Sequence, residues 1–133
     1  MNYKEIVTKA VIAKGKKNST NNYTLQTEET PNTILGCWVI NHTFNGTNLG
    51  NKVLVNGNFD VNVWYSYDND SKTAVSTQKF NYTDTMRMNI DNNQTGTEVI
   101  VKSIQQPTVS DVNIKDGIVN LNITKELGIE IVG

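Results

Sequence analysis

Residues 52–67 read Lys-Val-Leu-Val-Asn-Gly-Asn-Phe-Asp-Val-Asn-Val-Trp-Tyr-Ser-Tyr. Apolar side chains recur at the odd positions from Val53 to Tyr67, and polar side chains fill most of the even positions between them. Alternation with a period of two is typical of a β-strand that has one face in the core and the other in water. Trp64 breaks this rule, because it places a large apolar ring on the polar face.

The flanking sequence indicates more strands of the same kind. Residues 34–44 form an apolar run that ends at the turn signal Asn45-Gly46. A polar turn at residues 68–71 precedes another strand, so that residues 58–83 are predicted to form a β-hairpin. Further strands are expected at residues 4–14, 85–90, 98–105, 108–114, 119–124 and 127–132.

These segments predict an all-β fold with one domain over residues 1–133. About eight to ten short, mostly antiparallel strands are expected, in a β-sandwich or a partly closed barrel. Residues 15–33 are predicted to be a polar, mobile connection, with a brief strand near Tyr23 and Leu25. Pro107 is expected to mark an edge or a bend, because proline has no backbone N–H to donate.

Composition argues against several classes of function. The net charge of −1 does not suit nucleic-acid binding, which usually needs a basic face. Lys14, Lys16 and Lys17 are interpreted as a solvated strand end rather than as a phosphate site. No segment approaches the ~20 apolar residues that span a bilayer, and no signal peptide is apparent. We therefore expect a protein that is made and kept inside a cell, without membrane insertion.

Catalytic and metal-binding patterns are also missing from the sequence. His42 is the single histidine and Cys37 the single cysteine, so the chain offers few ligands for zinc and no recognisable catalytic triad. We expect no enzyme activity and no cofactor. Cys37 lies in an apolar run, where it is either a small buried hydrophobe or an intermolecular cross-link.

The aromatic residues are the candidates for a binding surface. Trp64 is either an exposed anchor for a protein or a sugar ring, or a core residue in a sheet that is covered on both faces. Tyr65 and Tyr67 share the core-facing parity. The predicted fold and interface elements lie in residues 34–42 and 58–67, and the candidate residues are Trp38, Ile40, Asn41, His42, Asp60, Asn62, Trp64, Tyr65 and Tyr67.

Several blocks of the chain resemble a known family. Residues 5–17, the block Ile-Leu-Gly-Cys-Trp-Val-Ile-Asn-His at 34–42 and the block Asp-Val-Asn-Val-Trp-Tyr-Ser-Tyr at 60–67 are similar, in order, to the CotE family of outer spore coat proteins. The resemblance covers nearly the whole chain. It departs from the family at Cys37, where the family has glycine, and at Gly133, where the sequence ends without the family's acidic tail.

The resemblance implies a morphogenetic scaffold. Such proteins are made in the mother cell, self-associate as homo-oligomers around the forespore, and lie between the inner and outer coat. The resemblance also implies binding to other spore coat proteins, including the basement-layer morphogenetic ATPase. A rival from another class is a carbohydrate-binding β-sandwich that uses Trp64 and a tyrosine as stacking platforms.

Overall fold

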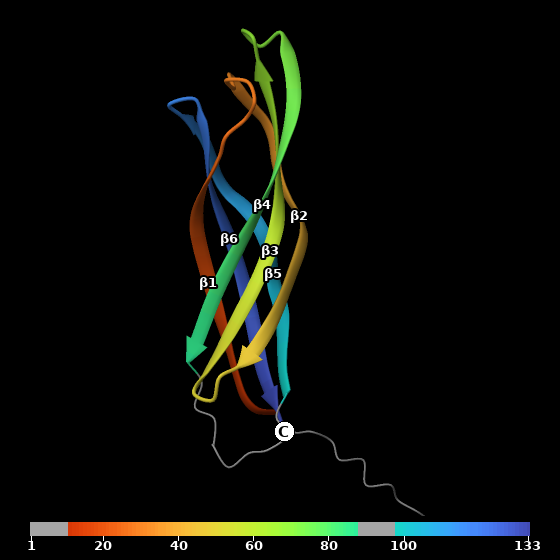
Figure 1. Ribbon diagram of the computed structural model, residues 1–133, viewed down its shortest axis with the longest axis vertical. Helices are drawn as coiled ribbons and strands as arrows, with labels where there is room; N and C mark the ends of the chain where they lie inside the picture. Colours follow the sequence, from red (N-terminus) through yellow and green to blue (C-terminus); the bar gives the residue numbers. More distant parts are fainter. Residues whose placement is uncertain (1–10, 88–97) are drawn as a thin grey trace, which may run out of the picture.

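The computed structural model describes residues 11–87 and 98–133, and these residues form six antiparallel strands in two sheets (Figure 1). Sheet A has the order β1-β6-β5 and sheet B the order β2-β3-β4. The strands are β1 (Val11–Leu25), β2 (Thr33–Asn48), β3 (Lys52–Tyr67), β4 (Lys72–Arg87), β5 (Glu98–Lys115) and β6 (Ile118–Val132).

The core lies between the two sheets and is supplied mainly by their middle strands. In β3 the inward row includes Val55, Phe59 and Val63, and in β6 it includes Leu121 and Ile129; each is almost completely buried. Because both middle strands are flanked by neighbours, the alternation that predicted residues 52–67 as a half-buried strand is sharpest there. The all-β prediction is confirmed.

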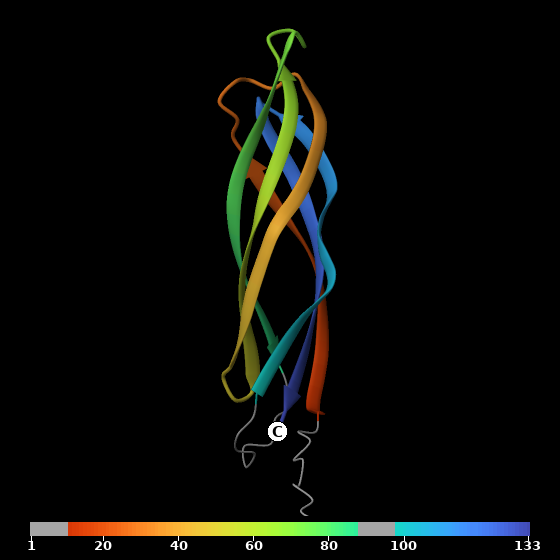
Figure 2. The same cartoon turned by 90° about the vertical axis from the view of Figure 1, so that its right-hand side faces the viewer.

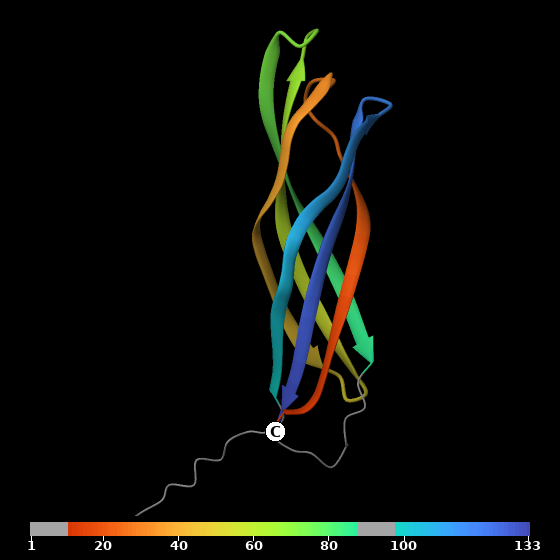
Figure 3. The ribbon, with the colours of Figure 1, turned by 180° about the vertical axis from the view of Figure 1, so that it is seen from behind.

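The two long sides of the sandwich differ. Figure 2 views the side on which β2 and β5 lie next to each other, and Figure 3 shows sheet A in front. A Cβ atom added to Gly46 of β2 would lie 2.5 Å from a methyl group of Val101 in β5, so glycine allows the sheets to approach closely at this point. β1 and β4 occupy the opposite side, where the ring of Tyr23 in β1 lies 4.8 Å from that of Phe80 in β4.

The predicted number of strands is wrong, and the sheets do not close into a barrel. The strands are fewer and longer, because several expected breaks lie inside them. Asn45-Gly46 is not a turn: β2 continues to Asn48, and the turn follows at Gly50, whose φ is 96°. Pro107 lies inside β5, an edge strand whose register with β6 shifts on either side of it. It bends the strand without ending it.

The boundaries of several strands also differ from those predicted. Residues 15–25, predicted to lie in the polar connection, are part of β1, and only residues 26–32 connect β1 to β2. They form a strand because β6 provides a partner for almost every residue of β1. Residues 127–132 continue β6 rather than starting a new strand. Parts of the strands expected at 4–14 and 85–90 lie outside the described residues.

The hairpin predicted at residues 58–83 is confirmed. Gly57 pairs with Tyr82 and Tyr67 pairs with Lys72, with no shift in register between them. The turn between the strands has positive φ angles at Asp68, Asn69 and Asp70. Asn and Asp tolerate this left-handed conformation better than most residues with a side chain, which explains their place in the turn.

A β-bulge in β2 controls which side chains of that strand face the core. The register with β3 shifts between Ile40 and Thr43, and Asn41 has a φ of 58°. Before the bulge, Val39 faces inward opposite Val61; after it, the inward position passes to His42 and Phe44. A bulge of one extra residue reverses the parity of a strand, and here it turns the histidine toward the interior.

Candidate functional site

The outer surface of sheet B exposes a group of large apolar side chains at the end of the sheet near the β3–β4 turn. Trp38 is 42% and Trp64 43% exposed, and Val75 is 55% exposed. We call this surface the aromatic face; its apolar members are Leu35, Trp38, Ile40, Trp64 and Val75. A monomeric protein gains nothing from holding so many large apolar side chains together in water, so such a group indicates a binding surface.

Gly36 brings the two tryptophans of the aromatic face together. Gly36 pairs with Trp64 across the β2–β3 ladder. A Cβ atom at Gly36 would lie 3.3 Å from the ring of Trp38 and 3.5 Å from the ring of Trp64. Both rings therefore lie against the backbone at a position without a side chain. This packing limits their rotamers, and a rigid aromatic pair loses little entropy when it binds a partner.

Polar groups surround the tryptophans. Asn62 is only 8% exposed although it faces outward, and its Oδ1 accepts a hydrogen bond of 2.5 Å from the hydroxyl of Thr77. Asn41 donates through Nδ2 to Asp60 Oδ2 at 3.0 Å, and Asp60 pairs with Lys79 on β4. The aromatic face thus has an apolar centre beside a polar border, as is usual for protein interfaces.

The structure separates the sequence-predicted candidates into two groups. Trp38, Ile40, Asp60 and Trp64 share the aromatic face with Asn62, and Asn41 is exposed at its border. The remaining candidates point inward: Tyr65 is 1% exposed, Tyr67 is half-buried with its ring 6.0 Å from that of Tyr65, and His42 lies between the sheets.

Cys37 faces the same way as the core residues of β2. It pairs with Val63 and packs against the core, and burial raises the pKa of its thiol. The thiolate is the form that attacks a disulfide, and a raised pKa leaves less of it at neutral pH, so Cys37 is a poor nucleophile. This position agrees better with a small buried hydrophobe than with a cross-link.

A buried polar cluster lies between the sheets and was not recognised in the sequence. Lys125 is 2% exposed; its Nζ lies 3.2 Å from Asp84 Oδ2 and 3.0 Å from Ser19 Oγ. Its ammonium group is also 4.1 Å from the centre of the Tyr82 ring, which is a cation–π contact. The alternation of the strand indicates this position, because Lys125 lies in the same core-facing row as Leu121 and Ile123.

Tyr82 links this cluster to His42. The Tyr82 hydroxyl lies 2.5 Å from His42 Nε2, and His42 Nδ1 lies 3.3 Å from Gln106 Oε1 on β5. Burial lowers the pKa of His42, and nearby Lys125 lowers it further, against the hydrogen bond to Gln106. Burial is also the main cause that raises the pKa of Tyr82. The cluster joins strands of both sheets and keeps its tyrosine neutral.

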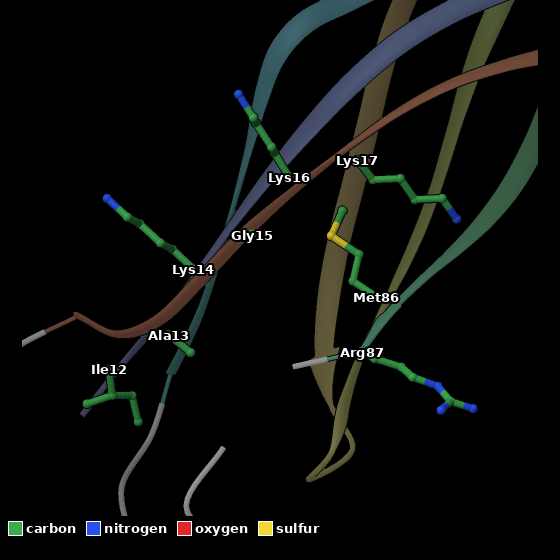
Figure 4. Close-up of a pocket in the computed structure, with 8 residues that line it drawn as sticks. All are labelled: Ile12, Ala13, Lys14, Gly15, Lys16, Lys17, Met86 and Arg87. Atoms are coloured by element: carbon green, nitrogen blue, oxygen red, sulfur yellow. The ribbon is translucent and has the colours of Figure 1, made fainter. Parts of the chain in front are cut away.

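A hollow opens between β1 and β4 near Arg87. It has a volume of about 560 Å³ and is lined in part by Lys14, Lys16 and Lys17. Figure 4 shows that Lys14 and Lys16 point to one side of the β1 ribbon, whereas Lys17 and Arg87 point to the other. Because the cationic ends diverge, they do not form a cradle for one anion.

Within residues 11–87 and 98–133 there is no group of three or more His, Cys, Asp or Glu side chains that could hold a metal ion. The same part of the chain contains no helix long and apolar enough to cross a membrane. The described site therefore consists of an outer binding surface and an inner stabilising cluster.

Comparison with protein families identifies the relatives of the chain. The family model described as outer spore coat protein E (CotE) matches residues 2–133. The chain belongs to the CotE family. No curated protein and no solved structure matches it. Membership of the CotE family makes the chain a spore coat protein and confirms the resemblance of its sequence blocks.

Proposed function

We propose that this CotE-family chain is a structural scaffold of the spore coat that self-associates and binds other coat proteins. The aromatic face is the observation that carries the proposal. It combines five large, partly exposed apolar side chains with a polar border on the outer surface of one sheet. Family membership supports a structural role in the coat.

The chemistry of the aromatic face suits protein binding. Tryptophan is among the residues that contribute most to interfaces, since each ring buries a large area with few rotatable bonds. Trp38 and Trp64 are held by packing at Gly36, and about two fifths of each side chain remains available to a partner. Asp60 and Lys79, which lie opposite each other in the β3–β4 ladder, supply one charge of each sign at the border, which can orient a partner.

We further propose that the partners include other spore coat proteins and the basement-layer morphogenetic ATPase. Deposition from the mother-cell cytoplasm onto the forespore surface would place the chain between the inner and outer coat. The aromatic face offers one surface for such recruitment, and the interior cluster leaves it unobstructed because the cluster lies on the opposite side of sheet B.

The first experiment is to measure solution mass by light scattering over a concentration series, together with capture of coat proteins from sporulating cells. Trp64→Ala and Trp38→Ala should reduce assembly or capture. Leu49→Ala is the matched control, because Leu49 is 48% exposed but lies in the β2–β3 turn, outside the aromatic face. If both tryptophan variants assemble and capture partners as the wild type does, the aromatic face is not the interface.

A carbohydrate-binding role is the second candidate, and the paired tryptophans favour it. Rings that lie beside a glycine, with the polar side chains of Asn41 and Asp60 at the border, offer both a stacking platform and hydrogen-bonding groups for a sugar. Titration with peptidoglycan fragments while tryptophan fluorescence is followed tests this. Saturable quenching that Trp64→Ala abolishes would support it, and an unchanged spectrum would exclude these fragments as ligands.

A further inference from the structure

The four edge strands of the two sheets differ in how far they are protected against pairing with another chain. A regular, unpaired edge exposes N–H and C=O groups that can accept a further strand, and proteins usually interrupt such edges with bulges, prolines or charges. β1 has a register shift near Ala13 and β5 has three around Pro107. β2 is interrupted by shifts near Leu35 and at Asn41.

β4 is the regular edge among the described strands. It pairs with β3 from Lys52 opposite Arg87 to Tyr67 opposite Lys72 without a single shift in register. Its sequence contains no proline and no glycine, and Lys79 is the only charged residue in the middle of the strand. β4 therefore offers a long edge of regular register with little to prevent the addition of another strand.

There is also open space beside this edge. A groove of about 310 Å³ runs along the first half of β4, between the strand and the β1–β2 connection. It is lined by residues of β4 such as Ala74, Ser76 and Gln78, and by Glu28 and Glu29 of the connection. β4 is the last strand of sheet B, so no other described strand of that sheet pairs with this edge, and the β1–β2 connection borders the groove.

We propose that β4 of one copy pairs antiparallel with β4 of a second copy, so that two copies of sheet B form one continuous six-stranded sheet. The inference rests on the proposed self-association and specifies its contact. Antiparallel pairing of a strand with its own copy produces a two-fold symmetric dimer, the commonest form of homo-oligomer. Each copy then supplies the same edge, and the outward backbone N–H and C=O groups of both edges gain hydrogen-bond partners.

Charge complementarity selects the register of this pairing. With Gln78 opposite Gln78 of the second copy, the paired segment runs from Lys72 to Asp84, and each Lys72 lies opposite Asp84 of the other copy. The Asp84 carboxylate already contacts the buried Lys125 and the 41%-exposed Lys17, so Lys72 of the second copy would add a further positive charge beside it. Opposite charges across a ladder stabilise the pair and like charges destabilise it.

The two neighbouring registers are worse. Moving the pairing centre to Lys79 places this lysine opposite itself, and moving it to Thr77 places Lys72 opposite Tyr82 and so removes the unlike-charge pair. Residues directly opposite each other in an antiparallel ladder point to the same side of the sheet. The symmetric registers that meet this condition have a residue at their centre, so the nearest alternatives move the centre by one residue in either direction. The register centred on Gln78 is therefore preferred.

This dimer would double the binding surface. Residues opposite each other in an antiparallel ladder share a face, so the aromatic faces of the two copies lie on the same side of the joined sheet. A coat protein that bound Trp64 of one copy would find the second copy's equivalent ring on the same surface. Two sites on one surface raise the overall affinity for a partner with repeated contacts.

Site-directed cross-linking tests the proposal. In a Cys37→Ala background, Gln78→Cys places two thiols directly opposite each other at the symmetry axis, within the Cα separation that a disulfide requires. Copper–phenanthroline oxidation should double the mass of most of the chain on a non-reducing gel. Asn81→Cys is the matched control: it is also exposed and on β4, but its two copies lie far apart, so it should remain mostly monomeric.

The outcomes separate this proposal from the proposed function. If light scattering shows that the wild type oligomerises but Gln78→Cys forms no more covalent dimer than Asn81→Cys, β4 is not the contact, and self-association proceeds elsewhere. If the wild type is monomeric at every concentration, self-association of this chain fails, and the β4 pairing fails with it. Circular dichroism of both cysteine variants checks that each retains the native strands.

Discussion

Lys125 and Asp84 form an ion pair between the two sheets, with 3.2 Å between Nζ and Oδ2. The contact has the distance of an ion pair but not the alignment of a good hydrogen bond, since Oδ2 has no hydrogen-bond partner. Ser19 and the ring of Tyr82 complete the surroundings of the ammonium group, and Lys17 lies 3.9 Å from the other carboxylate oxygen. The pair ties β6 of sheet A to β4 of sheet B.

Removing the charge of Lys125 should strongly destabilise the fold. Lys125→Met keeps the aliphatic length but leaves the buried carboxylate of Asp84 with only the more distant Lys17. Breaking a buried ion pair on one side costs about 3–5 kcal/mol, so the free energy of unfolding in urea should fall by that order. Lys102→Met is the control, because Lys102 pairs with Glu130 at the surface, where loss of a pair costs about 0–1 kcal/mol. Equal losses in both variants would contradict the role of burial.

Gly57 should not tolerate a side chain. A Cβ atom there would lie 2.3 Å from the Tyr82 ring, so Gly57→Ala must displace the ring and weaken its bond to His42. Overpacking of this kind costs about 1–3 kcal/mol, which a lower melting temperature would reveal. In a double-mutant cycle with Tyr82→Leu, the alanine should cost less once the ring is gone. Additive losses would show that the clash is not the cause.

Stability should depend on the protonation of His42, the only histidine. Burial lowers its pKa below the usual 6.5, so between the two values the unfolded chain binds a proton that the folded chain does not. The free energy of unfolding should therefore fall as the pH drops from about 7 toward 5, and level off below the lowered pKa. His42→Gln, which can still bond to Tyr82, should flatten this part of the profile. An unchanged slope would assign the dependence to carboxylates.

Cys37 should react slowly with thiol reagents in the folded protein. Its raised pKa reduces the thiolate fraction at neutral pH, and its inward position restricts access. The rate of reaction with Ellman's reagent should rise when urea unfolds the chain, and the solution mass of the wild type should be the same with and without reductant. Loss of mass under reductant would instead establish an intermolecular disulfide.

The sequence determined the all-β class, the β3–β4 hairpin and the middle strands of both sheets. Strict alternation is readable where a strand has a neighbour on each side and one buried face, as at Val61 and Ile123. It also determined that Tyr65 faces the core, and its blocks pointed to the CotE family. These features can be predicted from the sequence because the alternation of apolar and polar residues within one strand shows which of its faces is buried.

Tertiary structure decided the features that depend on a partner strand. The polar residues 15–25 form a strand because β6 pairs with them, and Gly46 continues β2 because β5 packs closely at that point. The bulge at Asn41 turns His42 inward, and Lys125 is tolerated in a core row because Asp84 arrives from the other sheet. Contacts between residues far apart in the chain set these outcomes, and one strand's sequence does not contain its partner's position.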